Sequence, residues 1–170
     1  MMRCFYAGSF DPPTLGHIDL IRRASRLFDE VVVGVMINPD KKGMFPVPER
    51  VEMLREETED LPNVRVVADS GLTVDMARRS GCQVLLRGVR GAQDVALEEQ
   101  LSGANRHVSG LETLILFTAP EYGYITSSIV RDLIRHGASV EGMVGESVKK
   151  RLTANEKTTH RFEDPSRSNL

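Results

Sequence analysis

Residues 7–17 (AGSFDPPTLGH) combine a glycine turn, a proline pair and a histidine in one short stretch. They follow the apolar segment 3–6 and lead into a run, 18–28, whose apolar residues recur at helical spacing. Backbone N–H groups and the positive end of a helix dipole then face one small volume, which suits a phosphate. His17 lies in the first helical turn beside that volume. The same pattern also occurs without a ligand, with the histidine on the surface, so other segments must support it.

Two further segments carry cations that could neutralise phosphate. Residues 87–90 (RGVR) place two guanidinium groups three positions apart beside a glycine, and arginine binds phosphate oxygens in bidentate fashion. Lys41 and Lys42 lie in a loop and supply mobile point charges. Both segments could equally be solvated surface turns. Asp94 and Glu98 follow at helical spacing; a phosphate would repel them, so they suit a ribose, a metal or an arginine.

Three successive hydroxyl residues, Thr126, Ser127 and Ser128, begin another helical pattern. One hydroxyl is accounted for as a helix N-cap. The others can hydrogen-bond a phosphate together with the free N–H groups of the helix start. A second helix start of this kind favours a polyphosphate site.

Hydrophobic periodicity predicts the elements that position these residues. Strands are expected at 3–6, 30–37, 63–68, 83–86 and 111–117, and helices at 18–28, from 47, at 72–80, 94–107 and 126–136, with a further helix at 144–154. Strands that alternate with helices pair in parallel through right-handed crossovers. The predicted fold is α/β, a Rossmann-like doubly wound five-stranded parallel sheet with helices on both faces, in a single domain.

Ligands of such sheets bind outside the carboxyl ends of the strands. This rule brings four loops to one edge: 8–17, 38–45, 87–91 and 120–128. Each loop contains polar or charged residues, as a shared binding cleft requires.

Composition limits the class of protein. The chain has 170 residues, enough for one domain, and a net charge of −2, which does not indicate a nucleic-acid partner. Its longest apolar run, 31–37, is far shorter than the roughly 18 residues that span a bilayer. Cys4 and Cys82 form no metal or redox motif. We therefore expect a cytoplasmic protein with no membrane partner, a domain at 1–154 and a polar, disordered tail at 155–170.

The motifs occur together in an order that resembles a known family. Residues 8–17 and 125–131 are similar to the two signatures of the nucleotidyltransferase α/β-phosphodiesterase superfamily, T-x-G-H and I-S-S-[ST]-x-x-R. With 38–45, 87–90 and 105–107 included, residues 3–153 resemble the bacterial phosphopantetheine adenylyltransferases. The chain departs from that family at 94–98, where DVALE replaces the usual D-F-E-Y-E, and Gly123 replaces a more usual serine.

The resemblance implies transfer of the adenylyl group of ATP to 4′-phosphopantetheine in coenzyme A biosynthesis, giving dephospho-coenzyme A and pyrophosphate. It also implies Mg²⁺, held mainly by the phosphates, and a homohexamer. The implied ATP-binding residues are Ser9, Phe10, His17, Gly88, Val89, Arg90, Glu98, Tyr122, Gly123, Tyr124, Ile125, Thr126, Ser127 and Ser128. The implied 4′-phosphopantetheine-binding residues are Ser9, Lys41, Thr73 and Arg87, and the implied catalytic residues are His17, Lys41, Arg90 and Ser127.

This chemistry needs no dedicated base, because a phosphate monoester, with a second pKa of about 6, is already ionised at neutral pH. Positioning and charge neutralisation then carry the reaction. We expect His17 to donate a hydrogen bond to the α-phosphate, Lys41 to bridge the two phosphates, and Arg90 and Ser127 to hold the leaving phosphates. Two alternatives remain: a related enzyme acting on another acceptor, such as nicotinamide mononucleotide or glycerol 3-phosphate, and a non-catalytic nucleotide-binding regulator.

Overall fold

Five parallel strands form one sheet in the computed structural model, which describes residues 1–40 and 42–159, the last five by their backbone alone. The strand order is β3-β2-β1-β4-β5. The strands are β1 (Arg3–Gly8), β2 (Glu30–Ile37), β3 (Val64–Ser70), β4 (Val84–Val89) and β5 (Glu112–Phe117). Because the chain winds outward in both directions from β1, the order reverses there, and the predicted doubly wound fold is confirmed.

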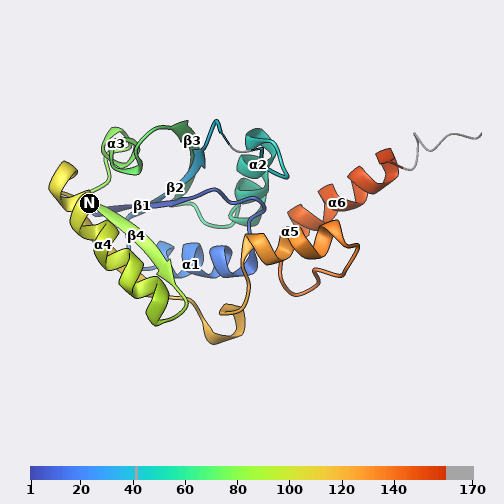
Figure 1. Cartoon of the computed structure of the whole chain (residues 1–170). Helices are drawn as coiled ribbons and strands as arrows, with labels where there is room; N and C mark the ends of the chain where they lie inside the picture. The colour runs from blue at the N-terminus through green and yellow to red at the C-terminus, as the bar shows by residue number, and fades with distance from the viewer. Residues whose placement is uncertain (41, 160–170) are drawn as a thin grey trace, which may run out of the picture.

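Helices cover both faces of this sheet, and Figure 1 shows α1 and α3 on opposite sides of it. The helices are α1 (Leu15–Ser25), α2 (Val47–Glu57), α3 (Thr73–Arg79), α4 (Ala92–Ser109), α5 (Ser127–Arg135) and α6 (Glu146–Thr159), with a short 3₁₀ turn η1 (Pro120–Tyr122) before α5. Local sequence explains several ends. Thr126 caps α5 with its side chain, and Gly110 ends α4 in the left-handed region at φ 74°.

Alternate residues of the central strands divide between two cores. Cys4 and Tyr6 of β1 pack with α1 and α2, whereas Phe5 and Ala7 pack with α3 on the other face. Gly34 interrupts the valine run of β2 because a Cβ there would lie 2.2 Å from Cζ of Phe5. The ring of Phe5 occupies the space that a larger residue in β2 would need.

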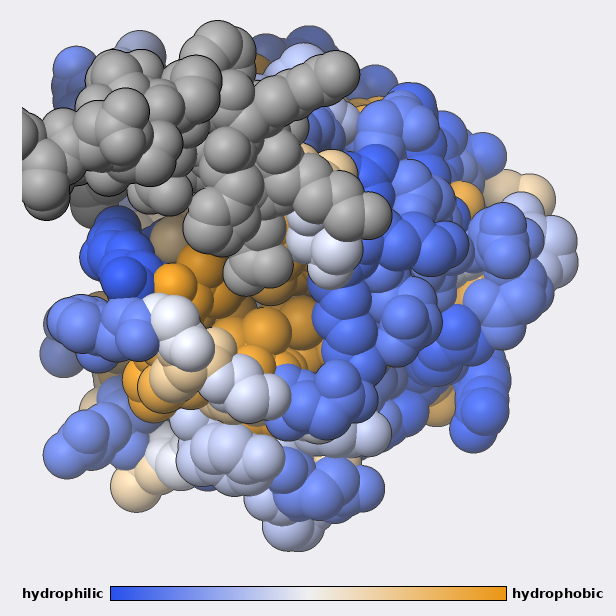
Figure 2. All heavy atoms as spheres, turned by 90° about the vertical axis from the view of Figure 1, so that its right-hand side faces the viewer, coloured by the Kyte–Doolittle hydropathy of each residue, from blue (hydrophilic) through white to orange (hydrophobic). Residues whose placement is uncertain are grey.

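A third apolar cluster closes the carboxyl-terminal part of the domain. Phe45 and Met53 pack there against α5, α6 and the segment between them. Figure 2 looks onto the side where α5 and α6 lie in Figure 1 and shows an apolar patch with hydrophilic side chains around it. On the described residues, no helix is both long enough and apolar enough to cross a membrane.

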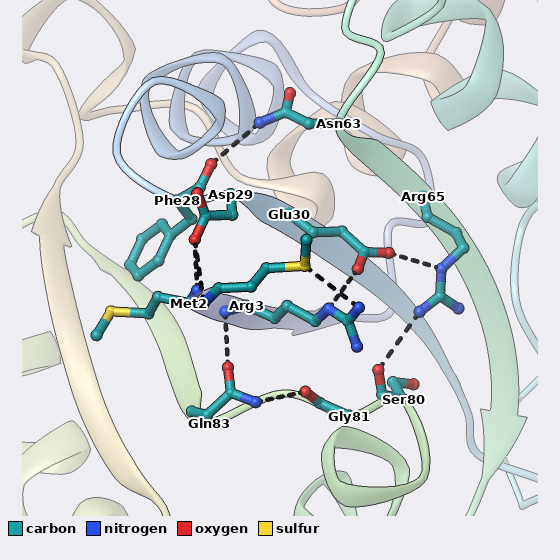
Figure 3. Close-up of polar contacts among 11 residues, drawn as sticks. Met2, Arg3, Phe28, Asp29, Glu30, Asn63, Arg65, Ser80, Gly81 and Gln83 are labelled. Carbon is teal, nitrogen blue, oxygen red and sulfur yellow. Dashed lines mark hydrogen bonds and ion pairs between the residues drawn. The ribbon is translucent and has the colours of Figure 1, made fainter.

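At the amino ends of the strands, two ion pairs join neighbouring strands of the sheet. Glu30 lies between Arg3 and Arg65, as Figure 3 shows, with N–O distances of 2.8 Å and 3.0 Å. Asn63 donates a hydrogen bond of 3.1 Å to the carbonyl of Phe28 nearby. These contacts tie together the starts of β1, β2 and β3, at the end of the sheet opposite the loops that the sequence predicts to bind ligands.

Several boundaries differ from the prediction, and the largest differences are in β4, α1 and α6. Residues 87–89 were expected in a loop but extend β4, because they pair in register with 115–117 of β5. Helix α1 begins at Leu15, not at 18, because Thr14 caps it, and it ends at Ser25, so that Phe28 reaches the core from the following turn. Helix α6 continues to Thr159, so the first five residues of the expected disordered tail are helical. Residues 160–170 lie outside the described residues.

Candidate active site

The carboxyl ends of β1 and β4 and the start of α5 enclose a cavity of about 220 Å³. We call it the His17 pocket. Its walls include many of the residues that the sequence singles out: His17, Arg87, Gly88, Arg90, Ile125, Thr126 and Ser127. The pocket is open to solvent on one side and has room for the phosphate groups of a nucleotide. The two helix starts, far apart in the sequence, therefore meet at one site that suits phosphate.

The ring of His17 is held by a reciprocal cap at the start of α1. The N–H of Thr14 donates to Nδ1 of His17 over 3.0 Å, and the N–H of His17 donates to Oγ1 of Thr14 over 3.4 Å. Burial, with a smaller contribution from the positive charge of Arg90, lowers the pKa of His17 to about 4. The imidazole is therefore neutral at neutral pH.

The Phe10 ring packs against this imidazole, and the Tyr6 ring in turn packs against Phe10. The ring of Phe10 meets that of His17 edge-to-face at 5.0 Å between centroids, and it meets Tyr6 at 5.6 Å. Phe10 has a φ of 45°, which is unusual for a residue with a side chain. The absence of a side chain at Gly8 leaves room for the Phe10 ring, because a Cβ at Gly8 would lie 2.9 Å from that ring. The Phe10 side chain is buried in the core, and the expected contact of this residue with ATP stays a prediction.

Each arginine of the 87–90 segment has a carboxylate partner on α4. Glu98 is buried and binds Arg87 with both oxygens, at 2.9 Å to Nε and 2.6 Å to Nη2. Asp94 accepts from the backbone N–H and from Nε of Arg90, both at 2.9 Å. These hydrogen bonds lower the pKa of Asp94. Of the partners that the sequence allows for Glu98, the structure shows an arginine, and the expected ATP contact of Glu98 stays a prediction.

The hydroxyl residues at the start of α5 have different partners. Oγ1 of Thr126 accepts from the N–H of Ile129 over 3.1 Å and is the N-cap. Oγ of Ser128 lies 3.0 Å from Oγ1 of Thr126. Ser127 lines the His17 pocket and donates to the carbonyl of Pro12 over 2.9 Å. Of the three, Thr126 and Ser127 line the pocket.

A second, larger cavity of about 1040 Å³ lies beside the first, among the loops that follow β1, β2 and β3. We call it the Lys42 cleft. Ser9, Asn38 and Lys42 line it together with two arginines of α5, Arg131 and Arg135. Arg131 was expected only as part of a motif, and Arg135 was not expected in the site at all. Their spacing of four residues on one helix face was the available signal.

Several expected site residues line neither cavity, and their roles stay predictions. The side chain of Val89 is fully buried, and Tyr124 is exposed to solvent. Thr73 begins α3 two positions after Gly71, which lines the Lys42 cleft, but Thr73 lines neither cavity. Tyr122 and Gly123 belong to η1 and its end, and the Tyr122 side chain packs on the third cluster. Lys41 lies outside the described residues.

The carboxylates near the His17 pocket do not form a metal centre. Within residues 1–40 and 42–159, no group of three or more His, Cys, Asp or Glu side chains is placed to hold a metal ion. Asp94 and Glu98, two of the three acidic side chains of α4, are both engaged by arginines. A Mg²⁺ ion carried in by phosphate oxygens fits this donor set better than one held by protein ligands.

Comparisons with known proteins point in one direction. The sequence model of the cytidylyltransferase-like family matches residues 5–133. A curated protein of Symbiobacterium thermophilum, named phosphopantetheine adenylyltransferase, is 49% identical over 153 residues, which is 89% of this chain and 94% of that protein. A solved structure from Vibrio parahaemolyticus, provisionally named nicotinate-nucleotide adenylyltransferase, has a TM-score of 0.65 at 18% identity and covers 92% of this chain and 94% of its own. The last likeness concerns the fold alone.

Proposed function

The chain belongs to the cytidylyltransferase-like family and, within it, to the phosphopantetheine adenylyltransferases, and we propose that it transfers the adenylyl group of ATP to 4′-phosphopantetheine. The products are dephospho-coenzyme A and pyrophosphate. The observation that carries this proposal is the meeting of His17, Arg90 and Ser127 in one pocket beside a larger cleft. The pocket suits the phosphates of ATP, and the cleft suits the acceptor.

The reaction is an in-line displacement at the α-phosphorus of ATP. An oxygen of the acceptor phosphate forms a new bond to that phosphorus, and the bond to the oxygen bridging the α- and β-phosphates breaks. Pyrophosphate leaves with the electron pair of that bond. Because the acceptor monoester has a second pKa of about 6, it attacks as an anion without a general base. The protein has to bring two polyanions together and neutralise the charge that develops between them.

His17 supplies a neutral hydrogen-bond donor for that charge. Its Nδ1 accepts from the N–H of Thr14, so the ring proton lies on Nε2. A donor fixed in this way stabilises the α-phosphate oxygen in the transition state and needs no reorganisation during the reaction. The N–H groups of Leu15 and His17 already donate to the carbonyl of Met143 and to Oγ1 of Thr14, so Gly16, which lines the pocket, is the residue of the first turn of α1 whose N–H is placed to assist.

Different cationic side chains bind the phosphates of the two substrates. Arg90 and Ser127, with the N–H groups of α5, hold the leaving phosphates, and Arg87 binds the acceptor phosphate from the other side of the pocket. Lys41 bridges the incoming and transferring phosphates; this assignment rests on the sequence motif. Its neighbour Lys42 lines the larger cleft. When bound, Mg²⁺ neutralises charge on the transferring nucleotide through the phosphate oxygens.

We also propose that the protein forms the homohexamer that the resemblance implies. Helix α4 buries little of its own surface and exposes Leu97, Leu101 and Val108 at helical spacing. The neighbouring edge strand β5 exposes Leu114 and Phe117. Contact between copies would cover these side chains. We further propose a cytoplasmic location, which is the one expected for an enzyme of coenzyme A biosynthesis.

A direct assay tests the function. The protein is incubated with ATP, Mg²⁺ and 4′-phosphopantetheine, and dephospho-coenzyme A is measured by mass spectrometry alongside pyrophosphate release. Nicotinamide mononucleotide and glycerol 3-phosphate serve as competing acceptors. Turnover with one of these alone would contradict the acceptor assignment. ATP binding by calorimetry without turnover of any acceptor would point to a nucleotide-binding regulator.

A further inference from the structure

The carboxylate of Asp11 is buried and fully engaged, although no role had been expected for it. Oδ2 accepts from the N–H of Met44, and Oδ1 accepts from the N–H of Phe45, both over 2.8 Å. Nε of Arg50 lies 3.3 Å from Oδ1. Asp11 is only 6% exposed. The side chain of Asp11, in the loop after β1, thus holds the main chain of the loop after β2.

Arg50 completes this junction from α2. It donates through Nε to the carbonyl of Phe45 over 2.7 Å and through Nη1 to the carbonyl of Ser9 over 3.2 Å. The loop passes so close that a Cβ at Gly43 would lie 1.6 Å from Nη2 of Arg50 and 3.0 Å from Oδ2 of Asp11. A larger residue at position 43 would therefore displace the Arg50 side chain.

The other side of the same loop is fastened to α5. Arg131 donates to the carbonyl of Asp11 over 2.6 Å, and Ser127 donates to the carbonyl of Pro12 over 2.9 Å. Residues 9–13 consequently lie between the loop after β2 and the first turns of α5. They also lie between the two cavities: Ser127 and His17 line the pocket, whereas Asp11 lines the cleft.

We propose that Asp11 is a positioning residue that sets the acceptor-side loop relative to His17. The inference rests on the proposed function, because the loop after β2 carries Lys42 and lines the cleft assigned to the acceptor. An ionised carboxylate can accept from two N–H groups and face a guanidinium at once. The amide of asparagine offers one oxygen, and its NH₂ group would leave a buried N–H donor unpaired.

The test compares Asp11→Asn with Glu57→Gln. Glu57 makes the same kind of bond, since its Oε1 accepts from the N–H of Ser147 over 2.8 Å, but it lines neither cavity. For Asp11→Asn we expect the KM for 4′-phosphopantetheine to rise about tenfold or more and kcat to fall, with the Kd for ATP changed less than about twofold. Glu57→Gln should leave all three within about twofold of wild type.

A second readout needs no substrate. Amide hydrogen exchange at Met44 and Phe45 should be at least about tenfold faster in Asp11→Asn, while exchange at Val33 in the central strand stays as in wild type. If Asp11→Asn does not fold, Arg50→Lys is tested in both assays with the same expectation, because lysine cannot reproduce the two carbonyl contacts.

The inference is overturned if the variant's acceptor KM matches that of Glu57→Gln, or if exchange at Met44 and Phe45 is unchanged. Failure of the proposed function looks different: wild-type protein would then make no dephospho-coenzyme A. In that case the exchange experiment still decides whether Asp11 holds the loop.

Discussion

The N–H of Thr14 donates to Nδ1 of His17 over 3.0 Å, across the first turn of α1. A backbone N–H can only donate, so Nδ1 must be unprotonated and the neutral ring must carry its proton on Nε2. The residue that caps the helix therefore also selects the tautomer. This explains why the motif places threonine three positions before histidine: the helix cap and the hydrogen-bond donor form one hydrogen-bonded unit.

Replacement of His17 by alanine should lower kcat about 10²–10³-fold, the usual cost of losing one transition-state donor. ATP affinity, measured by calorimetry, should change much less, because the hydrogen bond acts on charge that develops during the reaction. His136→Ala, an exposed histidine at the end of α5 that lines neither cavity, is the matched control and should retain normal turnover. Near-normal kcat in His17→Ala would remove this residue from the mechanism.

The pKa of His17 makes a prediction about acid stability. The folded-state pKa is about 4, below the ordinary histidine value of 6.5, so the unfolded chain binds a proton at pH values where the folded one does not. The free energy of unfolding should therefore decrease as the pH falls from about 6.5 toward 4, by at most about 3 kcal/mol from this group. Urea titrations at both ends of this range should show a smaller decrease for His17→Ala. An equal decrease in both proteins would contradict the burial argument.

The pH dependence of activity should reflect the ionisation of a group other than His17. Because His17 stays neutral above its lowered pKa of about 4, its protonation does not limit turnover near neutrality. The decline of kcat/KM on the acid side should instead follow protonation of the acceptor phosphate, with an apparent pKa of about 6. Initial rates over a pH series, with ATP saturating, test this. A profile that moves when Thr14 is replaced by valine would assign the ionisation to the imidazole instead.

Replacement of two glycines by alanine should change the stability of the protein in opposite directions. Gly34→Ala places a methyl group 2.2 Å from the Phe5 ring in the core and should destabilise the protein by about 1–3 kcal/mol. Gly103 lies in the exposed interior of α4, where an added Cβ would meet no atom within 4 Å, so Gly103→Ala should stabilise by about 0.5–1 kcal/mol. Denaturant melts of both variants give the comparison. Loss of stability in Gly103→Ala would indicate that another chain covers this face.

The fold could be predicted from the sequence because its signals are local. The valine run of β2 and the helical spacing after Thr14 need no knowledge of distant residues, and the carboxyl-end rule then brings His17 and Ser127 together. Partners were harder to predict. The sequence did not single out the pairing of Glu98 with Arg87 from the other partners it allowed, and it gave Asp11 no role. Such pairings depend on backbone positions that neither segment specifies by itself.

Glu98→Gln should weaken acceptor binding through Arg87. The amide cannot engage both Nε and Nη2 of Arg87 as acceptors, so the guanidinium loses its fixed orientation toward the pocket. We expect the KM for the acceptor to rise about tenfold and stability to fall by about 1–3 kcal/mol. Glu99→Gln, the exposed neighbour, should change neither. A rise in the ATP Kd with an unaltered acceptor KM would instead favour the direct ATP contact first expected for Glu98.

The proposed assembly depends on the apolar side of α4. Leu101→Glu should convert the hexamer into smaller species in sedimentation velocity, because it places a charge among side chains that a neighbouring copy would cover. Leu27→Glu changes another exposed leucine, after α1, and should leave the assembly intact. A wild-type protein that sediments as a monomer at every concentration would contradict the proposal.

The loop 9–13 and the first turns of α5 stand between the two cavities, joined by the contacts of Ser127 with Pro12 and of Arg131 with Asp11. The acceptor phosphate must reach past this loop to the α-phosphorus, because the reaction joins the two substrates directly. A bisubstrate inhibitor that links an adenosine fragment to a pantetheine fragment should therefore keep the diphosphate span of the product at this point.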